Sequence, residues 1–177
     1  MDRDEPGILF IARMILPEVD YRKRFFMMEK TDNFALFYEK FKVKELLAYR
    51  NEAWSWSVRP VQPTLGSAII SLNRYAPSFS DVTADEMSQL ADIHFKFESA
   101  VKKVFNHNIM NYLALMMVDH HVHYHAIPRY DGEREFAGNK WVDNGWPALP
   151  VIPDSQHSDD PKVLYTIRDI LTQTIRC

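Results

Sequence analysis

Three histidines at alternate positions constrain this chain more than any other feature of its sequence. His121, His123 and His125 are separated by single apolar or aromatic residues. Alternate side chains of a β-strand point to the same face, so the spacing predicts a strand with three imidazoles in one row and its other face in a core. Such a row would form a shared polar face with mixed protonation at neutral pH. A neutral imidazole could then act as nucleophile beside a protonated donor, which suits phosphoryl chemistry.

Two other interpretations of the row stay open. Histidines can simply be part of a core or a surface. A metal site is the stronger rival, because imidazole is a common metal ligand. The whole row spans roughly 13 Å along a strand, so a further ligand would have to come from elsewhere. The candidates are His94, His107, His157 and the nearby Asp119.

The pattern around the row predicts an α+β domain, with an antiparallel sheet and one long helix packed on it. Thr83 and Glu86 form a capping box, and apolar residues then recur at helical spacing up to Asn106. Alternation predicts a half-buried strand at 54–58, and an apolar run predicts a central strand at 67–73. Further strands are expected at 43–49, 109–117 and 121–127, the last two as an antiparallel hairpin, and further helices at 33–40 and from 161 onward.

The chain ends are expected to be extensions of this one domain. Residues 1–30 show no clear period and are assigned to an N-terminal extension, residues 31–130 to the domain itself, and residues 131–177 to a C-terminal loop and helix packing on it. We therefore expect helical extensions at both ends. The stretch 131–153, with its glycines, prolines and tryptophans, is expected to be an ordered loop without regular structure.

Composition narrows the environment and the partners. The net charge of −3 provides no basic field for nucleic acid. Cys177 is the single cysteine, so an intrachain disulfide is excluded, in agreement with a reducing, cytoplasmic location. The apolar stretch at 7–16 is interrupted by Arg13 and is too short to cross a membrane. We expect a cytoplasmic protein with no nucleic-acid or membrane partner.

Residues 121–127 are similar to the histidine-triad signature. In that signature, three histidines are separated by single hydrophobic residues, and two hydrophobic residues follow the last histidine. Pro128, Arg129 and Tyr130 continue the likeness, and residues 56–70 resemble the two strands that form the nucleotide pocket of that superfamily. The resemblance covers roughly residues 34–130, and it includes the capping box and long helix in the expected order.

The resemblance implies a hydrolase of phosphoric anhydrides or phosphoramidates, or a nucleotidyl transferase. His123 would attack the α-phosphorus of a nucleotide and form a nucleotidyl-histidine intermediate, which water or another acceptor would resolve. His125 would donate to the phosphate or leaving group, and His121 would orient the His123 ring. The chemistry requires no metal or cofactor, and a homodimer is expected. The substrate-binding residues implied are Arg59, Gln62, Ser67 and Arg129.

Two departures from the family pattern leave the substrate open. Ser67 follows Gly66 where many members carry a further histidine, and the segment 117–120 is short and lacks phosphate-binding groups. Dinucleoside polyphosphates, nucleoside phosphoramidates and other phosphoryl donors therefore all remain candidates. Trp54 and Trp56 could stack on a base, although sheet packing is the stronger interpretation. The alternatives to catalysis by His123 are a nucleotide-binding module with vestigial catalysis and a metal-dependent hydrolase.

Overall fold

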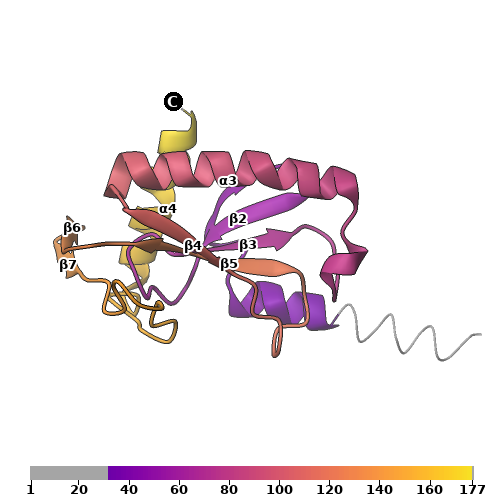
Figure 1. The fold of residues 1–177 in the computed structure, drawn as a ribbon, viewed down its shortest axis with the longest axis horizontal. Helices are drawn as coiled ribbons and strands as arrows, with labels where there is room; N and C mark the ends of the chain where they lie inside the picture. Colours follow the sequence, from indigo (N-terminus) through magenta and orange to yellow (C-terminus); the bar gives the residue numbers. More distant parts are fainter. Residues whose placement is uncertain (1–31, 177) are drawn as a thin grey trace, which may run out of the picture.

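The computed structural model describes residues 32–176 and shows an α+β fold, as the sequence predicts (Figure 1). The expected N-terminal extension over residues 1–30 lies outside the described residues. A helix over residues 32–40 comes first, and five antiparallel strands form the main sheet in the order β1-β2-β3-β5-β4. In chain order, the elements are β1 (Leu47–Arg50), β2 (Trp54–Val58), β3 (Ala68–Leu72), α3 (Ala84–Phe105), β4 (Ile109–Leu113), β5 (His123–Arg129), β6 (Arg134–Phe136), β7 (Asn139–Trp141) and α4 (Pro161–Arg176), with a 3-10 turn at Phe79–Asp81.

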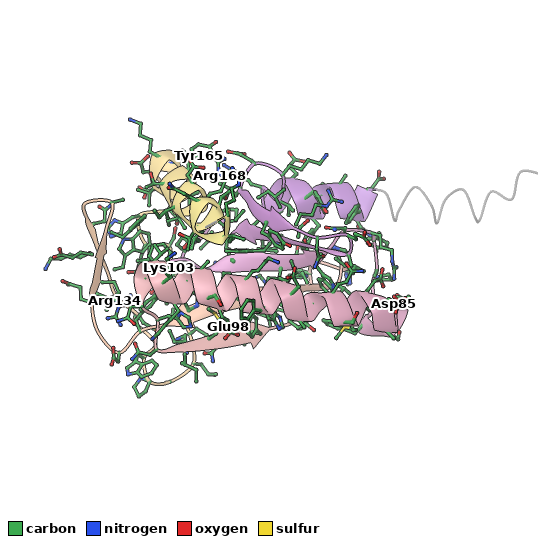
Figure 2. All side chains as sticks on the ribbon, turned by 90° about the horizontal axis from the view of Figure 1, so that it is seen from above. Asp85, Glu98, Lys103, Arg134, Tyr165 and Arg168 are labelled. Atoms are coloured by element: carbon green, nitrogen blue, oxygen red, sulfur yellow. The ribbon has the colours of Figure 1, made fainter. Side chains whose placement is uncertain are left out.

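The long helix α3 covers one face of this sheet, and the capping box sets its start (Figure 1). The Thr83 hydroxyl accepts from the Glu86 amide, the Glu86 carboxylate accepts from the Thr83 amide, and Asn106 ends the helix in the left-handed conformation. Helix α4 contacts α3, β1 and β2, and Figure 2 shows it beside α3, with Tyr165 and Arg168 on its visible side. The apolar faces of both helices bury Trp54 and Trp56 in the main core.

The opposite face of the sheet is covered by helix 32–40 (Figure 1). Phe37 of this helix and Phe41, in the turn directly after it, pack against Ile69 of β3. Helices on both sides make β2 buried along its whole length, including Ser55 and Ser57. The prediction of a half-buried strand at 54–58 was therefore wrong in its burial. Alternation of serine with tryptophan indicates which face is more apolar, but it does not reveal that a second helix covers the polar face.

Strand order agrees with the sequence better than strand boundaries do. β3 is central and antiparallel to both β2 and β5, and β4 pairs antiparallel with β5. β1 begins at Leu47 rather than at Val43, because residues 41–46 form turns after the helix and Lys42 has a positive φ of 48°. The connection between β4 and β5 spans residues 114–122 and is longer than predicted.

The C-terminal region contains one element that the sequence did not predict. Residues 131–153 were expected to lack regular structure, but β6 and β7 form a small antiparallel hairpin. Ala137 and Gly138 at its turn both have positive φ, as the tight hairpin turns that match strand twist require. α4 begins at Pro161, as expected. Among the described residues, there is no helix with the length and hydropathy needed to span a membrane.

Candidate active site

The histidine row lies on the sheet face that helix 32–40 covers. His123 and His125 belong to β5, opposite Ser71 and Ile69 of β3, and His121 lies two residues before the start of this strand. The Phe37 ring lies 4.7 Å from the His121 ring and 4.9 Å from the His123 ring, measured between centroids. Phe41 lies 5.7 Å from both His123 and His125. The three imidazoles thus share one face, as the alternation predicts.

These histidines do not form an exposed polar surface. The exposed fraction is 1 % for His121, 0 % for His123 and 5 % for His125. The shared polar face that the spacing predicts is therefore present, but it is buried. The aromatic rings of Phe37 and Phe41 pack against the imidazoles and help to exclude water from them.

Hydrogen bonding fixes which nitrogen of His123 is free to react. Its Nδ1 lies 2.7 Å from the carbonyl oxygen of His121, and a carbonyl only accepts, so Nδ1 carries the proton. In the neutral ring, Nε2 then holds a lone pair. Nε2 of His125 lies 3.3 Å from it and is the donor of this contact. His123 therefore presents an unprotonated Nε2 next to an N–H donor, which is the pairing that a nucleophile and its acid partner need.

The ring of His121 is clamped on both sides. Its Nε2 donates to the Leu72 carbonyl at 3.0 Å, and its Nδ1 accepts from the Ala76 amide at 3.4 Å. Both ring nitrogens are therefore occupied by the backbone, and the main-chain carbonyl of His121 is the group that contacts His123. A side chain so placed can position the nucleophile but is not free to touch a phosphate.

Burial lowers the pKa of all three histidines. Desolvation lowers the pKa of His121 to about 4 and that of His125 to about 3, and the neighbouring charge of His123 adds to both effects. Desolvation also lowers the pKa of His123. These lowered pKa values all favour the neutral ring at pH 7, in contrast to the expectation of a protonated neighbour. The donor beside His123 is instead the N–H of a neutral His125.

Arg59 lies close enough to the row to influence it. Its charge contributes to lowering the pKa of His125, and burial lowers its own pKa to about 10. One guanidinium nitrogen, Nη1, donates to the carbonyl of Val61 at 2.6 Å, while Nε is buried without a partner among residues 32–176. Arg59 is thus the predicted anion-binding residue that the structure brings near the triad.

Gln62 and Ser67 are engaged within the loop between β2 and β3. The Gln62 amide donates to the carbonyls of Arg59 and Ser67 and accepts from the Gly66 amide. The Ser67 hydroxyl donates to the carbonyl of Thr64 at 2.8 Å. These bonds shape the loop at the end of the strands, and a direct role of either side chain in substrate binding stays a prediction.

Arg129 ends β5 in a buried ion pair. Its Nε lies 2.6 Å from Oδ2 of Asp143, and its other donors reach Asn111 and the carbonyl of Ala148. The pair anchors the segment after β7 to the end of the sheet. Its predicted contact with substrate likewise stays a prediction, because this side chain already holds four hydrogen bonds.

The structure also separates residues that the sequence left as candidates. Trp54 and Trp56 are fully buried on the α3 side, where Trp54 donates to the carbonyl of Glu86, so stacking on a base is excluded for both. Asp119 pairs with Lys40 of helix 32–40 at 2.7 Å. Within residues 32–176, there is no group of three or more histidine, cysteine or acidic side chains arranged to hold a metal ion.

Sequence reasoning missed the groups that face the triad from other elements. The helical spacing of Phe37 and Phe41 indicates an apolar face but not what it packs on. Ser71, the cross-strand partner of His123, carries no sequence signal, since a serine in a β-strand is ordinary.

Comparison with solved structures identifies the fold. The structure is similar to a hypothetical histidine triad nucleotide-binding protein from Sulfolobus tokodaii, with a TM-score of 0.57 and 15 % identity over 74 % of this chain and 83 % of that one. It is also similar to histidine triad proteins from Sinorhizobium meliloti (TM-score 0.58, 15 % identity, 75 % and 93 % covered) and Bradyrhizobium japonicum (TM-score 0.53, 17 % identity, 76 % and 94 % covered). No family model and no curated protein matches the sequence. At these identities, the likeness establishes that the chain has the histidine triad fold.

Proposed function

We propose that this chain, with its histidine triad fold, is a nucleotide hydrolase or nucleotidyl transferase that acts at the α-phosphate through His123. The observation that carries the proposal is the hydrogen-bonded order of the triad. The His121 carbonyl holds the Nδ1 proton of His123, which leaves the Nε2 lone pair for attack, and His125 supplies an N–H beside it. The Sulfolobus tokodaii protein with this fold is described as nucleotide-binding.

The two steps follow from these positions. Nε2 of His123 attacks the α-phosphorus, so that a P–N bond forms while the bond from phosphorus to the leaving group breaks. The N–H of the neutral His125 donates a hydrogen bond to the leaving atom, which departs with the electron pair of the broken bond. Water or another acceptor then attacks the phosphorus, the P–N bond breaks and returns its electron pair to Nε2 of His123, and the acceptor's proton passes to solvent. Arg59 is the group proposed to bind phosphate oxygens, because a guanidinium fork matches their geometry.

A single-turnover experiment tests this mechanism. Full-length protein is mixed with diadenosine tetraphosphate or adenosine phosphoramidate carrying a label at the α-phosphorus and quenched in base, which preserves phosphohistidine. A label that appears on the peptide containing residue 123 in the wild type, and not in His123→Ala, is the expected result. Turnover that is unchanged in His123→Ala would refute the covalent mechanism, and turnover restored to a chelated protein by zinc would favour a metal-dependent hydrolase.

A second candidate function is a nucleotide-binding module with vestigial catalysis. Two observations favour it: the histidines of the triad are buried, and Ser67 stands where many histidine triad proteins are expected to carry a further histidine. Binding of AMP without turnover of any labelled substrate would support this alternative. The expected homodimer is a separate prediction, which light scattering on the purified chain tests, since a monomer mass would contradict it.

A further inference from the structure

A strip of buried polar side chains crosses the sheet beneath helix 32–40. Ser71 is the cross-strand partner of His123, and Ser57 lies in the next row, which runs through Ile69 to His125. Cross-strand partners share one face of a sheet, with their Cβ atoms about 5 Å apart. Arg59 follows Ser57 by two residues and continues this row of polar side chains past the end of β2. We refer to Ser57, Arg59, Ser71 and His125 as the polar strip.

Each member of the polar strip keeps an unused hydrogen-bonding atom. The hydroxyls of Ser57 and Ser71, Nε of Arg59 and Nδ1 of His125 are all buried without a partner among residues 32–176. Leaving one such group unsatisfied costs roughly 1–3 kcal/mol, and folded proteins pair the great majority of them. Four on one face, next to the triad, indicate a surface built for a polar ligand rather than a core.

Helix 32–40 closes this surface with an apolar contact and one ion pair. Phe37 and Phe41 pack against the imidazoles of His123 and His125, with ring centroids 4.9–5.7 Å apart. Lys40 binds both carboxylate oxygens of Asp119 in the loop between β4 and β5, at 2.7 and 2.8 Å. The Lys40 side chain of this pair is half exposed, so the pair adds only about 0.2–1 kcal/mol to the contact. The phenylalanine side chains carry no polar atoms, so they leave the hydrogen-bonding groups of the polar strip without partners.

On its other side, the same helix borders a cavity among the described residues. This cavity of about 770 Å³ is lined by Phe34, Ala35, Tyr38 and Glu39 of the helix, together with residues of the turn after it, Arg50 of β1 and Asn73, which directly follows β3. Within residues 32–176, this helix is thus packed tightly on one side only, so it can shift without displacing a second packed layer of the described chain. Figure 1 shows this helix as a separate element on the sheet face opposite α3.

We propose that helix 32–40 is a displaceable cover and that the polar strip binds the phosphate-bearing substrate once this helix moves away. Ser57 and Ser71 then donate to phosphate or sugar oxygens, Arg59 pairs with the anion, and Phe37 and Phe41 govern access to His123. This inference rests on the proposed function for the identity of the ligand. The movement of the helix, however, is a property of the protein alone, so it can be tested without any nucleotide.

The first experiment measures the movement in full-length protein without ligand. Diethyl pyrocarbonate modifies accessible neutral imidazoles, and peptide mass spectrometry assigns the modified histidine. We expect slow modification of His123 in the wild type and at least a tenfold faster reaction in Phe41→Leu, a mild change that keeps the site apolar. Phe105→Leu, which shrinks a buried phenylalanine of α3, is the matched control and should leave the rate unchanged. Equal rates in all three proteins would overturn the cover.

The second experiment measures binding of AMP by titration calorimetry. Ser71→Ala should weaken binding by about tenfold, as expected when one hydrogen bond to a charged group is lost. Ser55→Ala is the matched control, because this buried serine lies opposite Ser71 but its hydroxyl already contacts Asn73. Phe41→Leu should strengthen binding. Wild-type protein that binds AMP unaffected by Ser71→Ala and Phe41→Leu would overturn the polar strip, whereas accessible histidines without any AMP binding would refute the proposed function and leave the cover intact.

Discussion

The two faces of the main sheet are built in opposite ways. The face under α3 and α4 is apolar and contains the large side chains of Trp54 and Trp56. The face under helix 32–40 carries three histidines and three serines, and four of its buried polar atoms lack a partner among the described residues, whereas on the first face Nε1 of Trp56 and Nε2 of His94 lack one. The first face therefore supplies stability through area removed from water, and the second gives up part of that stability. A polar surface kept buried at such a cost is expected where a ligand binds.

The strongest test of this difference between the two faces is to replace one phenylalanine on each face with alanine. Phe97 of α3 is fully buried and packs edge-on against Trp56, and its replacement by alanine should cost about 3–5 kcal/mol of unfolding free energy. Phe37→Ala should cost clearly less, because helix 32–40 can settle and water can reach the unpaired groups beneath it. Urea unfolding followed by tryptophan fluorescence measures both. Equal losses would mean that the two faces are packed alike.

Two buried arginines allow the stability contribution of a group in an ion pair to be compared with that of a group outside one. Arg129→Met should cost about 3–5 kcal/mol, because it leaves the buried carboxylate of Asp143 without its partner. Arg59→Met should change the unfolding free energy by less than about 1 kcal/mol, since Arg59 has a carbonyl but no buried carboxylate as its partner among the described residues. The same unfolding experiment compares them, and a large loss for Arg59→Met would show that it is structural.

Low pH should destabilise the folded protein through the buried histidines His121 and His125. An unfolded histidine has a pKa of about 6.5, whereas the folded pKa is about 4 for His121 and about 3 for His125. Between these pH values, the unfolded chain binds more protons than the folded protein does. The stability that the neutral histidines contribute is therefore fully present above pH 6.5, and it is lost as the pH falls toward 4 for His121 and toward 3 for His125. Each histidine contributes up to roughly 1.4 kcal/mol per pH unit over its own range.

Denaturant unfolding at pH 7.5 and pH 5 in the wild type and His125→Asn measures this effect. The variant should lose less stability between the two pH values. His157→Asn, in the loop before α4, serves as the control and should behave as the wild type does. An identical pH dependence in all three proteins would contradict the burial of an uncharged His125.

The smallest change in unfolding free energy is expected at the ion pair between helix 32–40 and the loop that connects β4 and β5. Lys40→Gln removes the exposed pair with Asp119 and should lower the unfolding free energy by only about 0.2–1 kcal/mol. Exchange of the two charges in Lys40→Asp with Asp119→Lys should restore much of this loss. A cost of several kcal/mol would show that the pair, rather than the aromatic contact, holds helix 32–40 in place.

Local patterns in the sequence determined much of the fold. The capping box at Thr83 fixes where α3 begins, the alternating histidines place three imidazoles on one face, and the apolar run at 67–73 marks β3 as central. Each of these features depends on residues that are close together in the sequence, so the sequence pattern alone predicts them. The start of α4 at Pro161 is of the same kind.

Only the tertiary structure decided the state of the site. The contact of Phe37 with His123 joins residues 86 positions apart, and the pairing of Ser71 with His123 joins two strands whose register no local pattern records. Burial is a property of the whole assembly, so the sequence showed a row of histidines but not that it is covered, neutral and bordered by unpaired serines. The chemistry of the triad is thus encoded locally, whereas access to it is set by long-range packing.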